Sequence, residues 1–157
     1  MAAPLLRVED LRTQFFTSRG IVHAVDGISF NVGRGETVGI VGESGSGKTM
    51  TAFSILRLVP DPGRIVSGRI LFKDQDVVQM NDDDVREFRG NDVAMIFQDP
   101  LTSLDPTKTI GYQVAEPVRL HKGASKAAAR ARARLIPSAS IGSAPSRMPA
   151  VSARMTG

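Results

Sequence analysis

Eight consecutive residues, numbers 42–49, constrain this chain more than any other stretch. They read Gly-Glu-Ser-Gly-Ser-Gly-Lys-Thr and match the pattern G-x-x-x-x-G-K-[ST], which is typical of loops that bind phosphate groups. The apolar run 37–41 before them predicts a buried strand, and residues 50–58 after them, which lack glycine and proline, predict a helix. Because strand, loop and helix is the context that the motif requires, we favour a phosphate-binding loop over an ordinary Gly/Ser turn before a helix.

The residue types in this loop predict how it would hold the phosphates of a nucleotide. Its glycines allow positive φ angles and bring backbone N–H groups close to an anion, toward which the following helix also points its positive end. Lys48 is expected to contact the β- and γ-phosphates, and Thr49 to offer its hydroxyl to Mg²⁺. The predicted nucleotide-binding residues of the loop are Gly42, Glu43, Ser44, Gly45, Ser46, Gly47, Lys48 and Thr49.

The composition is that of a globular protein of roughly one domain, with 41% hydrophobic and 23% charged residues among 157. No run approaches the ~20 apolar residues of a membrane-spanning helix. Residues 1–6 lack the basic start and the apolar stretch of a signal peptide, so a cytosolic protein is the default expectation. The chain contains no cysteine, which excludes disulfides and thiolate metal sites.

Charge is distributed unevenly along the chain. All 16 acidic residues lie at or before Glu116, whereas residues 117–157 contain eight basic residues and no acid. Residues 136–157 are rich in Ser, Ala, Pro, Arg and Met, show no periodicity and contain no aromatic residue. We therefore predict a folded part over residues 1–135 and a disordered, basic, low-complexity tail over residues 136–157. Such a tail is solvated or, alternatively, contacts nucleic acid or anionic lipid.

The remaining patterns predict an antiparallel β-subdomain followed by part of a parallel α/β core. The predicted strands are 5–16, 21–32 (one strand or a pair), 67–72 and 93–97, the last a continuous apolar run expected to be a buried parallel strand. The predicted helices are 81–88 with Asn81 as its cap, 109–120 with an interruption at Pro117, and 125–135 with Ser125 as its cap.

The run 97–106 reads Phe-Gln-Asp-Pro-Leu-Thr-Ser-Leu-Asp-Pro and follows the apolar stretch 93–97. Together with the phosphate-binding loop and the hairpin before it, this run resembles the ATP-binding cassette (ABC) ATPases. More narrowly, it resembles the ATPase subunits of bacterial oligopeptide, dipeptide and nickel importers, over roughly residues 5–135. The resemblance implies the N-terminal part of a P-loop NTPase: an α/β protein with an antiparallel β-subdomain and a partial parallel sheet with helices.

The resemblance also implies roles for further side chains. Phe15 in the first hairpin would stack on adenine, with Phe16 as the neighbouring candidate and a core phenylalanine as the alternative. Gln98 would contact Mg²⁺ and the attacking water; the alternative is a strand-end amide bonded to the backbone. Asp99 is assigned to the loop that follows rather than to the magnesium carboxylate. The implied catalytic residues are Lys48 and Gln98, and the implied metal ligands are Thr49 and Gln98.

By resemblance, the chain is expected to bind ATP and Mg²⁺ and to couple ATP binding and hydrolysis to the uptake of oligopeptides or dipeptides. The implied partners are transmembrane permease subunits and a second ATPase subunit, with no specific nucleic acid. The implied location is cytoplasmic and peripheral, at the inner face of the cell membrane.

The sequence departs from the family in its second half. The signature Leu-Ser-Gly-Gly-Gln and the later apolar strand ending in Asp-Glu are absent, and neither His23 nor His121 lies in the context of the family's switch histidine. We therefore expect a C-terminally truncated subunit, of the kind that a frameshift produces, with ATP hydrolysis near zero. The alternatives are an inert or merely nucleotide-binding fragment without a transport role, and a soluble ABC ATPase that acts on nucleic acid.

Overall fold

The computed structural model describes residues 3–97, 105–139 and 150–154. The chain divides into two compact units, residues 1–85 together with 146–157, and residues 86–145. In the described part of the chain, no helix combines the length and the apolar character that crossing a membrane demands.

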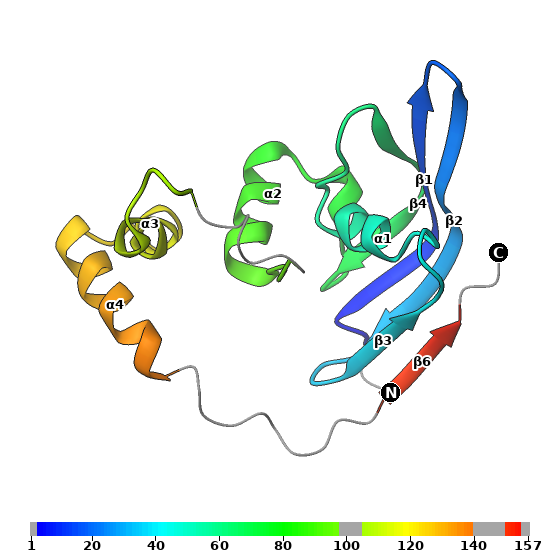
Figure 1. Ribbon diagram of the computed structural model, residues 1–157. Coiled ribbons are helices and arrows are strands. Elements are labelled where there is room, and N and C mark those ends of the chain that lie inside the picture. The colour runs from blue at the N-terminus through cyan, green and yellow to red at the C-terminus, as the bar shows by residue number, and fades with distance from the viewer. Residues whose placement is uncertain (1–2, 98–104, 140–149, 155–157) are drawn as a thin grey trace. The chain divides into compact units, whose positions relative to one another are not determined.

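A four-stranded antiparallel sheet forms most of the first unit (Figure 1). Its strands are β1 (Leu6–Thr17), β2 (Gly20–Val32), β4 (Gly63–Phe72) and β5 (Gln75–Asp76), in the spatial order β2-β1-β4-β5. Strand β1 lies in the centre and pairs antiparallel with both β2 and β4. The antiparallel hairpin that the sequence predicts before the phosphate-binding loop is confirmed as β1 and β2, whereas β4 and β5, which complete the sheet, follow the loop.

Side chains from one face of the strands build the interior of this unit. On β1, the side chains of Val8, Leu11 and Thr13 are buried, and the register shift between Val8 and Leu11 lets residues three apart share the covered face. The other buried apolar side chains of this unit come from β2, β4 and the segments that follow α1 and β5: Val25, Ile70, Phe72, Leu56, Val77 and Val85.

The strand and the helix predicted on either side of the phosphate-binding loop are confirmed as β3 (Thr37–Val41) and α1 (Lys48–Ile55). The predicted burial of the strand is wrong, because the residues of β3 alternate between exposed and half-buried. Helix α1 is joined to the antiparallel sheet by a buried hydrogen bond of 2.7 Å between the hydroxyl groups of Ser54 and Thr13. The hydroxyl of Ser54 also donates to the carbonyl oxygen of Met50, at 2.7 Å. Because of the bond between Ser54 and Thr13, both of these buried hydroxyl groups have a hydrogen-bond partner in place of water.

Strand β3 pairs in parallel with β6 (Ala150–Arg154), in a register that sets Thr37 beside Ala150 and Val41 beside Arg154 (Figure 1). This strand lies in the segment for which the sequence predicts no regular structure. The physical reason lies in β3, whose edge presents backbone N–H and C=O groups that need hydrogen-bond partners. The short segment Ala150–Arg154 supplies these partners.

Short helical turns follow the sheet. These are η1 (Val77–Gln79), α2 (Asp82–Glu87) and the π-helical η2 (Phe88–Asp92). The predicted cap of α2 is confirmed, because the N–H of Asp84 donates to Oδ1 of Asn81 at 2.9 Å.

In the second unit, α3 (Ile110–Lys122) packs against α4 (Lys126–Ala139). The contact is made by the buried side chains of Ala115, Ala129 and Ala133, which let the two helices approach closely. The predicted cap of α4 is confirmed by a 3.3 Å bond from the N–H of Ala128 to Oγ of Ser125. The predicted interruption at Pro117 is wrong: α3 continues through this residue, losing one backbone donor without ending.

The prediction of a buried strand over residues 93–97 is also wrong. Val93 has the extended backbone of a strand, but its N–H closes the preceding helical turn by donating to the carbonyl of Phe88 at 3.0 Å. Ile96 is 97% exposed and Phe97 49% exposed. Among the described residues, no neighbouring strand pairs with this run. Its high strand propensity therefore does not lead to the hydrogen bonds of a sheet.

Candidate nucleotide-binding site

The loop between β3 and α1 has the backbone form that a phosphate cradle needs. Gly45 and Gly47 adopt φ angles of +84° and +87°, in the left-handed region that favours glycine. Helix α1 begins directly after Gly47, at Lys48, and the N–H of Thr51 makes a 2.8 Å bond to the carbonyl of Gly47. The N–H groups of the first helical residues have no partner within the helix and therefore point out of its N-terminus, toward the loop.

Close packing requires glycine at position 47 of the loop, whereas the atom that faces Gly42 ends a side chain that can turn away. A Cβ atom on Gly47 would clash with the backbone carbonyl oxygen of Ala24, in β2. A Cβ atom on Gly42 would lie 2.5 Å from Oγ of Ser46, across the loop. The contact at Gly47 shows that β2 packs directly against the loop. The contact at Gly42 shows that Gly42 and Ser46 lie close to each other.

The side chain of Lys48 lies across the mouth of the loop. Its Nζ donates to the carbonyl oxygens of Gly42 at 2.8 Å and of Glu43 at 2.6 Å, and lies 3.3 Å from Oγ of Ser46. The ammonium group therefore sits where backbone dipoles attract a cation, within reach of any anion that enters the loop. A phosphate there would gain a charged donor in addition to the backbone N–H groups.

The structure describes one of the two residues expected to bind Mg²⁺. Thr49 lies in the first turn of α1 and is exposed, so its hydroxyl would be available to a metal ion. Gln98 and its neighbour Asp99 lie outside the described residues. Among the residues that are described, no cluster of three or more His, Cys, Asp or Glu side chains is placed to hold a metal ion.

Phe15 and Phe16 are both half-buried on β1. The ring of Phe15 covers Gly63 on the neighbouring strand, where a Cβ atom would meet Cε1 of the ring at 2.7 Å and Cγ1 of Val59 at 2.8 Å. The ring of Phe16 faces the guanidinium of Arg64, whose Cζ lies 4.2 Å from the ring centroid. Phe15 is therefore the one of the two whose ring lies near Val59, in the segment that follows α1. The stacking of Phe15 on adenine stays a prediction.

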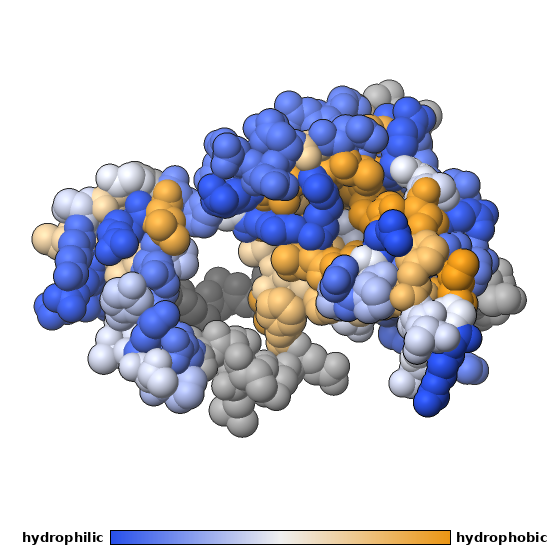
Figure 2. Space-filling view, turned by 90° about the horizontal axis from the view of Figure 1, so that it is seen from above, coloured by the Kyte–Doolittle hydropathy of each residue, from blue (hydrophilic) through white to orange (hydrophobic). Residues whose placement is uncertain are grey.

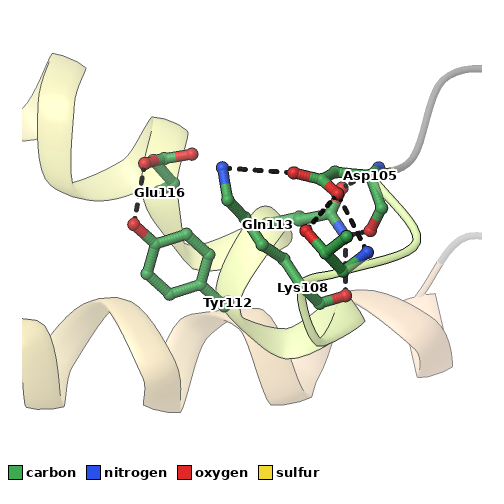
Figure 3. A network of polar contacts seen from close by, with 6 residues as sticks. Asp105, Lys108, Tyr112, Gln113 and Glu116 are labelled. Atoms are coloured by element: carbon green, nitrogen blue, oxygen red, sulfur yellow. Dashed lines mark hydrogen bonds and ion pairs between the residues drawn. The ribbon is translucent and has the colours of Figure 1, made fainter.

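A polar network before α3 was not anticipated from the sequence. The side chain of Gln113 accepts from the N–H of Asp105 and donates to the carbonyls of Asp105 and Lys108, at 2.8–3.0 Å (Figure 3). The hydroxyl of Thr107 donates to Asp105 and lowers the pKa of that carboxyl, helped by the backbone N–H of Thr107 and by Lys108. In turn, Asp105 raises the pKa of Lys108. The sequence signal was Asp-Pro-Thr, a turn pattern in which Asp bonds the backbone two residues later.

These features define the class of protein. A β-branched strand, a glycine loop with two left-handed residues and a helix that begins at the loop lysine form the core of a P-loop NTPase of the α/β class. A family model described as ABC transporter matches residues 25–150. The chain therefore belongs to the ABC transporter family.

Its relatives include ATP-binding proteins of peptide transporters. The chain is 47% identical over 130 residues to a probable peptide ABC transporter ATP-binding protein of Sinorhizobium fredii and to the oligopeptide transport ATP-binding protein AppD of Bacillus subtilis. It is 43% identical over 129 residues to the dipeptide transport ATP-binding protein DppD of Escherichia coli. Each match covers 82% of this chain and 39–40% of the relative. The chain thus spans about two-fifths of the length of these relatives.

Solved structures support the fold. A dimeric ATP-binding cassette in a post-hydrolysis state, bound to ADP and Pi, superimposes with a TM-score of 0.70 at 24% identity, over 82% of this chain and 54% of the other. A component of an ABC transporter complex, cbiO1 of Clostridium perfringens, gives a TM-score of 0.61 at 28% identity, over 83% of this chain and 48% of the other. The fold of an ABC ATPase, in its N-terminal part, is therefore established.

Proposed function

We propose that the chain binds the phosphates of ATP at residues 42–49. One observation carries the proposal: a glycine loop with two left-handed residues ends in a helix that starts at Lys48. Backbone N–H groups of the loop and the helix N-terminus would hold the phosphates, and Nζ of Lys48 would exchange the carbonyls of Gly42 and Glu43 for phosphate oxygens. Mg²⁺ would bind at the hydroxyl of Thr49, with phosphate and water as further ligands.

Calorimetry with Mg-ATP tests the binding step. Hydrogen bonds to charged groups contribute about 1.5–3 kcal/mol, so Lys48→Ala should weaken ATP binding about tenfold or more. Lys73→Ala is the matched control, because it removes the same charge from an exposed position between β4 and β5. If Lys48→Ala and Lys73→Ala bound Mg-ATP with equal affinity, residues 42–49 would not be the nucleotide-binding site.

We further propose that the protein acts as the ATP-binding subunit of a peptide importer, together with transmembrane permease subunits and a second ATPase subunit, at the inner face of the cell membrane. The support is that relatives at 43–47% identity are named as peptide transport ATP-binding proteins. A soluble ATPase acting on nucleic acid has no such support.

A chimera tests this role. Residues 1–135 would replace the matching segment of the E. coli dipeptide transport ATP-binding protein, which would supply the remainder of the ATPase. The chimera should support dipeptide uptake, and the same chimera with Lys48→Ala should not. A chimera that binds ATP but leaves uptake at the level of the lysine variant would overturn the importer role while leaving nucleotide binding intact.

A further inference from the structure

The hollow between α3 and α4 is lined by cations that the nucleotide site does not use. It has a volume of about 350 Å³ and opens to solvent. The residues around it are Thr109, Gly111, Tyr112, Arg130, Ala133 and Arg134. A smaller hollow beside it shares Tyr112 and Arg130 and adds Lys126 and Arg119. Figure 2 shows the α3–α4 pair as a surface on which hydrophilic side chains predominate.

Helix geometry aligns three of these cations. Lys126, Arg130 and Arg134 are spaced four residues apart on α4, so they follow one another along the same face, about 6 Å apart along the axis. Ala129 and Ala133 are buried against α3, which fixes the rotation of α4 and keeps the basic face on the rim of the hollow. Arg132 is exposed and lines neither hollow.

These cations are not neutralised by the carboxylates nearby. Glu116 accepts a 3.0 Å hydrogen bond from the hydroxyl of Tyr112, and Asp105 pairs with Lys108 at 3.3 Å, as Figure 3 shows. Within the part of the chain that the structure describes, no carboxylate pairs with Arg130 or Arg134. The hollow therefore carries an excess of positive charge.

We infer that the α3–α4 hollow is a binding site for a small anion with two phosphate groups, separate from the nucleotide loop. A guanidinium offers paired N–H donors that match the oxygens of a phosphate, and two of them one helical turn apart match two linked phosphates. The hydroxyl of Thr109 and the ring of Tyr112 complete the wall. A concave site of this size fits a small ligand better than a flat membrane or a nucleic-acid backbone, which need an extended basic surface.

Inorganic pyrophosphate is the probe, measured by calorimetry on a Lys48→Ala background, in which the nucleotide loop binds phosphate about tenfold or more weakly than in the unaltered chain. Lys48→Ala alone should retain one pyrophosphate site. Adding Arg130→Ala should weaken that site about tenfold, as expected for a lost charged hydrogen bond. Adding Arg132→Ala should change the affinity less than twofold, although it removes the same charge from the same helix.

Alanine favours helix, so both arginine variants should keep the helical signal in circular dichroism. Equal losses from Arg130→Ala and Arg132→Ala would mean non-specific attraction and would overturn the site. Absence of pyrophosphate binding in the Lys48→Ala background would do the same, while ATP binding by the unaltered chain would still support the proposed function. Binding that Arg130→Ala weakens only with phosphatidylglycerol vesicles or with RNA would replace the small anion by that partner and would also refute the inference.

Discussion

Gly45→Ala and Gly47→Ala form a matched pair that tests how the phosphate-binding loop is held. Both residues have a positive φ, +84° and +87°, so each alanine must adopt a left-handed backbone. This conformation costs roughly 1–2 kcal/mol for a residue with a side chain. At Gly45 the added Cβ meets no atom within 4 Å, so the loss in the free energy of unfolding should be this cost alone.

At Gly47 a second cost is added. The new Cβ would lie closer than 3.0 Å to the carbonyl oxygen of Ala24, a separation that real Cβ atoms essentially never show. That oxygen belongs to the backbone of β2 and cannot turn away as a flexible side chain would, so the strand or the loop must move. Overpacking of this kind costs typically about 1–3 kcal/mol. Gly47→Ala should therefore lower the free energy of unfolding by about 2–5 kcal/mol in total.

Urea unfolding followed by circular dichroism gives both free energies, and calorimetry gives the affinity for Mg-ATP. We expect Gly45→Ala to lose less stability than Gly47→Ala, and Gly47→Ala to bind ATP more weakly because its loop is displaced. Equal losses in the two variants would show that the contact between the loop and β2 contributes nothing. The account of how the sheet shapes the loop would then be wrong.

Three further outcomes are expected. Thr13→Val should lower the free energy of unfolding in urea by about 0.5–1.5 kcal/mol, because Ser54 loses its bond to Thr13 and keeps only its bond to Met50; an unchanged midpoint would contradict this. Thr107→Val should raise the pKa of Asp105 toward 3.8 in an NMR titration, since the Thr107 hydroxyl is the largest cause lowering it. Because the folded pKa is lowered, the contribution of Asp105 to stability is present above about pH 3.8 and is lost as pH falls through the lowered value. Removing residues 150–157 should speed hydrogen exchange of the β3 amides that β6 pairs, and unchanged protection would refute the pairing.

Local patterns predicted most of the first unit. Each of three elements has a signal in its own residues. Strand β1 shows loose alternation, β3 is rich in β-branched residues, and α1 follows a glycine loop and contains no glycine or proline. The caps at Asn81 and Ser125 were also predictable, because a cap is a contact between residues two or three positions apart. Where the signal and the contact lie within a few residues, the sequence is sufficient.

Long-range pairing was not predictable in the same way. Residues 93–97 have strand propensity, yet whether they form a strand depends on a neighbour that propensity does not specify. Conversely, Ala150–Arg154 has a weak local signal and becomes a strand because β3 offers it an edge. The basic face over the α3–α4 hollow was visible as charge in the sequence, but its concave shape depends on how Ala115 packs against Ala129 and Ala133.

The loop helix is anchored to the antiparallel sheet at two points, and this decides what the nucleotide site needs in order to form. Its N-terminus follows Gly47, which touches the backbone of β2, and its second turn carries Ser54, which bonds Thr13 of β1. Both contacts lie within the first unit, so the shape of the loop is imposed by the sheet before it rather than by the helices after it. The supports of the loop that these two contacts provide therefore lie among residues 13–54.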